Sequence, residues 1–185
     1  DSELKAVFNG MLDKLEGFTD GILYWQSSRG TADRDHAYPE NTVPANLLSY
    51  IKPKKLPDIT KKIKLITLPD LRYSICHIKT INLIPNVMAS EKAKAAGCDE
   101  AVFIREGRVT ECSHSNISIL KNGLFITAPL DHTILPGIAR GHVIEICKDH
   151  GIPVELRAFT PEEMMEADEI LVTSTTTLCR SACEI

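Results

Sequence analysis

The chain has 185 residues, of which 43% are apolar, and its net charge at neutral pH is −4. This apolar share can build a core for one large domain or two small ones. Acidic and basic residues are interspersed, no basic block occurs and no apolar run reaches the thickness of a bilayer, so neither nucleic acid nor a membrane is an expected partner.

The six cysteines form no C-x-x-C pair. Disulfide scaffolds are usually smaller and denser in cysteine, so we expect reduced thiols. No His/Cys spacing matches a zinc site, so no metal is expected. Because the sequence starts with a polar, amphipathic helix rather than a secretion signal, we expect a soluble cytoplasmic protein.

The first predicted element is an amphipathic helix between Leu4 and Leu15, in which apolar residues recur at helical spacing. The sequence begins inside this helix and stops just after a strand-like segment, so we expect both ends to be truncated. A strand is predicted over 22–26. Two prolines and clustered charge at 52–58 disfavour regular structure, which places a domain boundary there.

The boundary divides the chain into residues 1–54 and 55–185. Apolar patterning and turn signals in the second part predict strands over 63–68, 74–83, 100–105, 108–111, 117–120, 124–127, 154–159 and 169–174. Helices are predicted over 86–96, over 137–150, and after the Thr160-Pro161 capping motif. Hairpins mixed with a few helices indicate an α+β fold rather than a doubly wound sheet.

One lysine stands inside an otherwise apolar, strand-like run. Lys79 lies between Cys76 and Leu83, where the pattern predicts burial. Taken alone, such a lysine would usually extend to solvent from a strand edge, because buried unpaired lysines are rare. A partly desolvated amine is, however, a good nucleophile and proton carrier, so Lys79 is a candidate catalytic residue.

Further polar motifs follow in order along the chain. Glu111 opens a hydroxyl-rich turn that ends at Asn116, the segment 135–138 starts a helix with Pro-Gly, and a run of Thr and Ser at 173–176 ends a strand. A loop near the start of the chain, 29–36, reads Arg-Gly-Thr-Ala-Asp-Arg-Asp-His. Each motif alone is a weak signal, since exposed glutamates and polar loops are common.

Together these segments resemble the fold type IV pyridoxal-phosphate enzymes, the superfamily of D-amino-acid and branched-chain aminotransferases. Within it, the resemblance is closest to the D-amino-acid (D-alanine) aminotransferases. The match covers essentially the whole chain but begins part-way into the family's first domain. It implies the remainder of a small N-terminal α/β domain, followed by a barrel-like, mixed-sheet cofactor-binding domain with flanking helices.

The resemblance implies roles at the cofactor, pyridoxal 5′-phosphate. Lys79 would bond covalently to it and move the substrate proton, and Glu111 would pair with its ring nitrogen. Asn116 would shape the turn or bind near the phenolic oxygen, and Leu135 would pack on the ring. The phosphate-binding residues would be Ile138, Ala139, Ser174 and Thr175. Arg72 would lie near the cofactor, although a surface arginine is nearly as common, and the role of His77 stays open.

The loop at 29–36 bears on the substrate. A guanidinium and an adjacent imidazole can hold a carboxylate by several hydrogen bonds. The resemblance implies that Arg34 and His36 bind the substrate α-carboxylate across a homodimer interface. The expected reaction is transamination between a D-amino acid such as D-alanine and a 2-oxo acid such as 2-oxoglutarate.

Three alternatives remain open on the same scaffold. The first two are a branched-chain L-amino-acid aminotransferase and an aminodeoxychorismate lyase. The third is a truncated domain that keeps the architecture without catalytic competence.

Overall fold

The computed structural model describes residues 2–17, 19–40 and 42–185. The chain divides into a first unit, Asp1–Leu56, and a second unit, Pro57–Ile185. This division falls within the proline-containing segment 52–58. Among the described residues, no helix combines the length and the apolar character that a membrane crossing requires.

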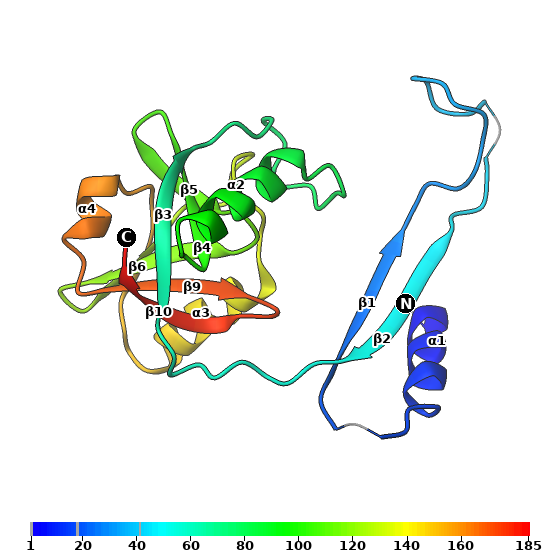
Figure 1. The fold of residues 1–185 in the computed structure, drawn as a ribbon, viewed down its shortest axis with the longest axis horizontal. Helices are drawn as coiled ribbons and strands as arrows, with labels where there is room; N and C mark the ends of the chain where they lie inside the picture. Colours follow the sequence, from blue (N-terminus) through cyan, green and yellow to red (C-terminus); the bar gives the residue numbers. More distant parts are fainter. Residues whose placement is uncertain (1, 18, 41) are drawn as a thin grey trace. The chain divides into compact units, whose positions relative to one another are not determined.

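The described residues of the first unit form one helix and two strands, which Figure 1 labels α1, β1 and β2. They are α1 Ser2–Leu12, β1 Gly21–Ser27 and β2 Leu47–Pro53, and the strands pair antiparallel. Tyr24 of β1 stacks on its register partner Tyr50, with ring centroids 5.0 Å apart. β2 was not predicted. No described residue of this unit is buried, so these contacts stabilise it without a closed core.

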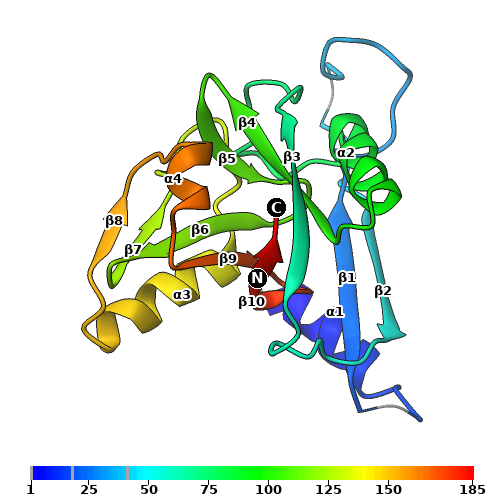
Figure 2. The same cartoon turned by 60° about the vertical axis from the view of Figure 1, so that its left-hand side comes forward.

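The second unit is built on a mixed sheet of eight strands (Figure 2). Their order is β5-β4-β3-β10-β9-β6-β7-β8, and β5 also contacts β6, so the sheet curls on itself. The fold is α+β, as predicted. The strands are β3 Ile63–Pro69, β4 Glu100–Arg105, β5 Arg108–Cys112, β6 Asn116–Lys121, β7 Leu124–Thr127, β8 Val154–Leu156, β9 Glu169–Ser174 and β10 Leu178–Glu184.

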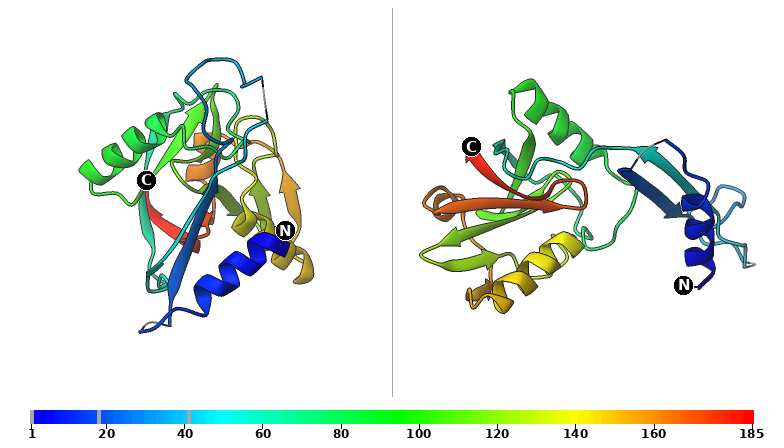
Figure 3. Two further views of the ribbon diagram at one scale, coloured as in Figure 1. Left: turned by 90° about the vertical axis from the view of Figure 1, so that its right-hand side faces the viewer. Right: turned by 90° about the horizontal axis from the view of Figure 1, so that it is seen from below.

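Three helices accompany this sheet: α2 Ile84–Ala95, α3 Ile138–Asp149 and α4 Pro161–Met165. The right-hand view of Figure 3 shows α2 and α3 on opposite sides of the strands. The predicted cap of α4 is confirmed, since the Thr160 side chain accepts a hydrogen bond from the backbone N–H of Glu163.

The core of the second unit has two parts. Inside the curled sheet, side chains from six strands and α4 pack together, among them Val102 and Val172, both at most 1% exposed. On the outer face, Ala89 and Ala93 of α2 pack against Phe103. Successive residues of β4 thus serve opposite faces of the sheet, as strand geometry requires.

One predicted strand of this unit was wrong, and one strand of its sheet was not predicted. Residues 74–83 form a loop with turns rather than a strand. The sheet position beside β3 is taken instead by β10, which was not predicted and which pairs parallel with β3. Apolar residues of the loop such as Ile78 and Ile81 are exposed, 51% and 75%, so its apolar pattern does not reflect burial.

Candidate active site

One cavity of about 630 Å³ opens in the second unit. Its walls come from five segments that are far apart in the sequence: the loop after β3, the start of α2, the turn between β5 and β6, the start of α3 and the end of β9. A volume of this size suits a small-molecule ligand. The cavity brings together Lys79, Glu111, Asn116, Leu135, Ile138, Ala139, Ser174, Thr175 and Arg72.

Lys79 contributes to the cavity wall from the loop after β3. The expectation of a lysine sheltered in an apolar strand was wrong, because the residue is exposed and its segment is not paired in the sheet. His77, whose role the sequence left open, is exposed in the same loop and also contributes to the cavity wall. The loop is instead tied down by Tyr73, whose hydroxyl donates to the carbonyl of Asn82 and lies 3.4 Å from the hydroxyl of Thr80.

Glu111 is buried at the base of the cavity, with its side chain 8% exposed. One carboxylate oxygen pairs with the Arg72 guanidinium. The other accepts hydrogen bonds from the backbone N–H of Leu135 at 2.9 Å and from the side-chain amide of Asn116 at 3.0 Å. Since a carboxylate offers about four lone-pair directions, about one remains for a further donor.

The buried guanidinium of Arg72 has a second carboxylate partner besides Glu111, namely Asp70. Asp70, whose side chain is fully buried, accepts from Arg72 Nε at 2.9 Å and from Arg72 Nη2 at 2.8 Å. Asp70 also pairs with Arg105 at 3.0 Å and accepts a hydrogen bond from Thr110 at 3.1 Å. The result is a paired, hydrogen-bonded network directly behind the cavity wall, as buried charges require.

The network shifts the pKa of both carboxyl groups. Burial raises the pKa of Glu111, and the charge of Arg72 only partly opposes that rise. Burial would also raise the pKa of Asp70, but the hydrogen bonds and charge of Arg72 outweigh it, so this pKa lies below its usual value. The lowered pKa keeps the Asp70 carboxyl group ionised at neutral pH.

Hydrogen bonds to Glu100, the first residue of β4, hold the turn between β5 and β6 in place. This carboxylate is 3% exposed and accepts from the Ser113 hydroxyl and, at 2.9 Å, from the Ser115 hydroxyl. It also lies 2.9 Å from Nδ1 of His114. Glu100 thus fixes the hydroxyl-rich turn that carries Glu111 at one end and Asn116 at the other.

The start of α3 forms another wall of the cavity. Its N-cap, Gly137, provides no side chain to bond the first backbone N–H groups. The first turn of a helix leaves these N–H groups unpaired and carries a partial positive charge, an arrangement that binds anions. A β-carbon at Gly137 would lie only 2.0 Å from Oδ1 of Asn116, so the close approach depends on glycine.

Ser174 and Thr175 contribute to the cavity wall at the end of β9. The Ser174 hydroxyl also accepts from the backbone N–H of Thr177 at 3.0 Å, which closes the turn into β10. Hydroxyls at this point of the wall can bind a polar ligand.

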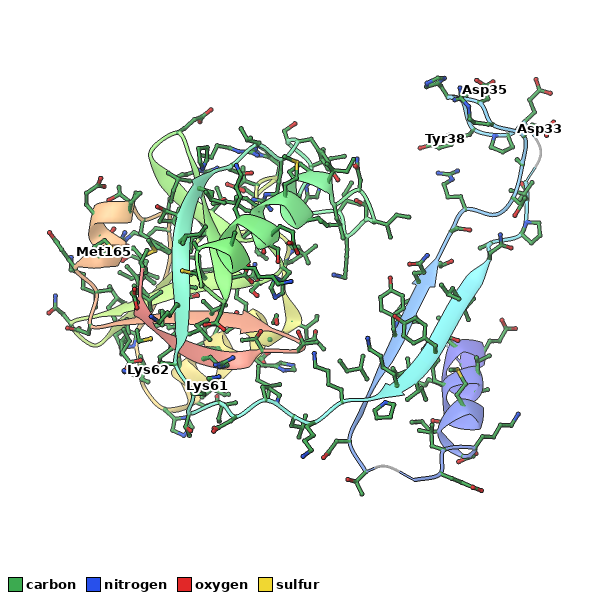
Figure 4. All side chains as sticks on the ribbon, viewed as in Figure 1. Asp33, Asp35, Tyr38, Lys61, Lys62 and Met165 are labelled. Atoms are coloured by element: carbon green, nitrogen blue, oxygen red, sulfur yellow. The ribbon has the colours of Figure 1, made fainter. Side chains whose placement is uncertain are left out.

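Arg34 and His36 belong to the first unit, in the loop between β1 and β2, and both are exposed. Figure 4 labels Asp33, Asp35 and Tyr38 in the same loop. The guanidinium of Arg29 lies 3.7 Å from the ring centroid of Tyr38, a cation–π contact within this loop.

Two residues of the site were missed in the sequence. Asp70 follows β3 after a proline, where an aspartate often accepts a hydrogen bond from the backbone two residues on, and it does so here from Arg72 at 3.1 Å. An aspartate at such a position predicts a turn, but it does not predict that the carboxylate is buried. Glu100 starts an apolar strand, and no local pattern distinguishes it from an exposed strand end.

The description "Amino-transferase class IV" belongs to a family model that matches residues 1–185, the whole chain. The chain belongs to the amino-transferase class IV family. A D-alanine aminotransferase from Bacillus licheniformis is 37% identical over 178 residues, which cover 95% of this chain and 62% of that protein. The chain thus spans less than two thirds of the length of this relative.

Solved structures of aminotransferases share the fold. A branched-chain aminotransferase from the archaeon Thermoproteus uzoniensis, solved with norvaline, matches with a TM-score of 0.77 and 28% identity, over 100% of this chain and 63% of that chain. An aminotransferase from Brucella abortus bound to the cofactor PLP matches with a TM-score of 0.80 over 99% of this chain and 67% of that chain. The second match, at 21% identity, shows the fold alone.

Proposed function

We propose that the protein transfers an amino group between a D-amino acid such as D-alanine and a 2-oxo acid such as 2-oxoglutarate, with pyridoxal 5′-phosphate as cofactor. The observation that carries the proposal is a cavity whose wall combines a lysine, a buried glutamate and a helix N-terminus. An aldehyde, a ring nitrogen and a phosphate on one ligand call for this combination of groups.

The donor set fits the cofactor. The start of α3 has unpaired N–H groups for a phosphate, and Ser174 and Thr175 add hydroxyls. Glu111 keeps about one lone-pair direction after its bonds to Arg72, Leu135 and Asn116, which suits a protonated ring nitrogen. Ala139 offers no hydroxyl, so at that position the backbone N–H would carry the contact.

Each residue would have a distinct task. When bound, the cofactor supplies an electron sink for charge that develops at the substrate Cα. Lys79 would hold the cofactor and move the proton at its Nζ, because its loop position leaves the amine accessible to the cavity. Glu111 would keep a proton on the ring nitrogen, and Leu135 would orient the ring. Arg72 would position Glu111.

The choice of a D-amino acid rests on the relatives and on the loop at 29–36. The Bacillus licheniformis relative is 37% identical to the chain, and Arg34 with His36 would bind the substrate α-carboxylate. The same proposal includes a homodimer, because the family resemblance implies that this pair acts across subunits. It also includes a cytoplasmic location, with which six free cysteines agree.

A branched-chain L-amino-acid aminotransferase is the second candidate function. The Thermoproteus uzoniensis structure, named a branched-chain aminotransferase, matches 100% of this chain at 28% identity. The aminodeoxychorismate lyase alternative has a similar solved structure too: the "Putative 4-amino-4-deoxychorismate lyase" from Legionella pneumophila matches with a TM-score of 0.81 and 26% identity, over 89% of this chain and 61% of that chain.

Turnover assays of the whole protein distinguish these activities. The purified protein is supplied with 2-oxoglutarate and D-alanine, L-alanine or L-leucine in turn, and separately with aminodeoxychorismate. We expect amino transfer from D-alanine to exceed transfer from either L-amino acid, with no lyase product. Equal rates with both alanines, or a preference for L-leucine, would remove the D-amino acid from the proposal. The matched control is Lys79→Ala, which should abolish all of these reactions.

A further inference from the structure

One buried hydroxyl beside the cavity has no hydrogen-bond partner. Thr173 is 2% exposed, and among the residues that the structure describes its Oγ1 is the buried side-chain oxygen or nitrogen that lacks a partner. Thr173 also contributes to the wall of the cavity. A buried hydroxyl without a partner carries an unfavourable desolvation cost, and most buried polar groups in proteins do have a hydrogen-bond partner.

The strand geometry places Thr173 on the cavity side of β9. Its neighbour Val172 belongs to the core inside the curled sheet, and successive residues of a strand point to opposite faces. Thr173 is therefore on the other face, directly opposite its register partner Asn116 on β6. Asn116 in turn bonds Glu111 and approaches the glycine that starts α3.

The neighbours of Thr173 indicate the kind of ligand. The next residues along the strand, Ser174 and Thr175, also contribute to the wall of the cavity, and the Asn116 side chain lies close to Gly137 at the N-terminus of α3. Hydroxyls and unpaired backbone N–H groups are donors that bind an anion with several oxygens. Glu111 accepts from Arg72, Leu135 and Asn116, but it does not accept from Thr173.

We propose that the Thr173 hydroxyl donates a hydrogen bond to a phosphate oxygen of bound pyridoxal 5′-phosphate. This inference rests on the proposed function and adds to it a binding residue. The hydroxyl is paired only when the ligand is present, so the empty protein bears a cost that ligand binding removes. Removing the hydroxyl should therefore have opposite effects on the empty protein and on ligand affinity.

The test compares Thr173→Val, which keeps the side-chain shape, with Thr173→Ser, which keeps the hydroxyl. For Thr173→Val we expect the thermal midpoint of the cofactor-free chain to rise by about 2–4 °C. The dissociation constant of pyridoxal 5′-phosphate, measured by absorbance titration, should rise about tenfold. Thr173→Ser should bind the cofactor close to normally.

A matched control is Thr127→Val. The Thr127 hydroxyl is also fully buried, but it accepts from Ser118 and from Arg140, both at 2.9 Å. Its loss should lower the thermal midpoint, because two donors lose their acceptor. Opposite signs for the two valine substitutions would support an unsatisfied hydroxyl at 173.

Binding of pyridoxal, which lacks the phosphate, identifies the contacted atom. We expect Thr173→Val to leave pyridoxal affinity unchanged while weakening the phosphorylated form. Equal weakening of both, unchanged affinity for both, or a lowered midpoint of the cofactor-free Thr173→Val chain would overturn the inference. If the wild-type chain itself fails to bind pyridoxal 5′-phosphate, the proposed function fails instead, which is a distinguishable result.

Discussion

Buried charges behind the cavity wall are arranged so that each has an opposite partner. Asp70 lies between Arg72 and Arg105, and Arg72 lies between Asp70 and Glu111. Because a guanidinium can bond two carboxylates at once, Arg72 can hold Glu111 in place while Asp70 holds Arg72. The orientation of the residue proposed to bind the ring nitrogen therefore depends on a residue that does not line the cavity.

The substitution Asp70→Asn tests this dependence. It leaves two arginines with a weaker partner in a buried position, and breaking a buried pair costs about 3–5 kcal/mol. We expect a loss of this size in the free energy of unfolding, measured with urea. Asp149→Asn, at an exposed position, is the control and should stay within about 0.5 kcal/mol of wild type. Equal small effects would show that Asp70 does not hold the network.

Glu100 gives the protein a pH dependence of defined sign. Burial would raise the pKa of Glu100, but hydrogen bonds from His114, Ser113 and Ser115 outweigh it and hold this pKa below its usual value. A carboxyl with a depressed folded-state pKa stabilises the fold above its unfolded pKa, about 4.3, and this contribution disappears as the pH falls through the folded pKa.

The comparison that isolates Glu100 is wild type against Glu100→Gln. Wild type should be the more stable at pH 7, and the difference in unfolding free energy should shrink as the pH is lowered below about 4.3. Urea titrations at pH 7, 5, 4 and 3 measure it. A difference that stays constant across this range would mean that ionised Glu100 is not what secures the turn.

At the scale of elements, the start of α3 depends on a close approach to β6. Gly137 has an ordinary φ of −66°, so the requirement for glycine there is space rather than backbone freedom. An added β-carbon would meet the Asn116 side chain, which bonds Glu111. The Asn116 side-chain amide therefore connects the start of α3 to Glu111.

Gly137→Ala should therefore disturb the site, whereas Gly141→Ala should not. Gly141 lies in the same helix with open space around its α-carbon. We expect Gly137→Ala to lose about 1–3 kcal/mol of stability and to bind pyridoxal 5′-phosphate more weakly. Gly141→Ala should gain up to about 1 kcal/mol through helix propensity and bind normally. If both behave alike, the link through Asn116 is wrong.

Most elements of the second unit could be predicted because their apolar pattern and turn residues agree. The hairpin around Asn122-Gly123 and the start of α3 at Gly137-Ile138 are examples. The segment 74–83 could not, because its apolar residues lie in an exposed loop, and strand pairing depends on partners that the local sequence does not specify.

The same limit applies to the site. Motif resemblance identified residues that do line one cavity, including Lys79 and Glu111. It missed Asp70 and Glu100, whose burial results from tertiary packing.

On the scale of the whole molecule, the buried core and the cavity belong to the second unit. The described residues of the first unit include no buried side chain, while the core clusters and the cavity wall lie within Pro57–Ile185. A unit with its own core can fold alone.

We accordingly expect residues 57–185, expressed alone, to unfold cooperatively in urea and to give dispersed NMR amide signals. Residues 1–56 alone should not, because they bury too little apolar surface. A fragment 57–185 that lacks a cooperative transition would show that the first unit is required for the core.

The central claim is that Lys79 is the amine that bonds to pyridoxal 5′-phosphate. The most direct measurement adds the cofactor to the chain, fixes the covalent link with borohydride and maps the labelled peptide by mass spectrometry. We predict a single major label at Lys79 and its loss in Lys79→Ala, with Lys92→Ala, a change on the body of α2, labelled normally. A label at another lysine, or no visible absorbance on adding the cofactor, would contradict the proposed active site.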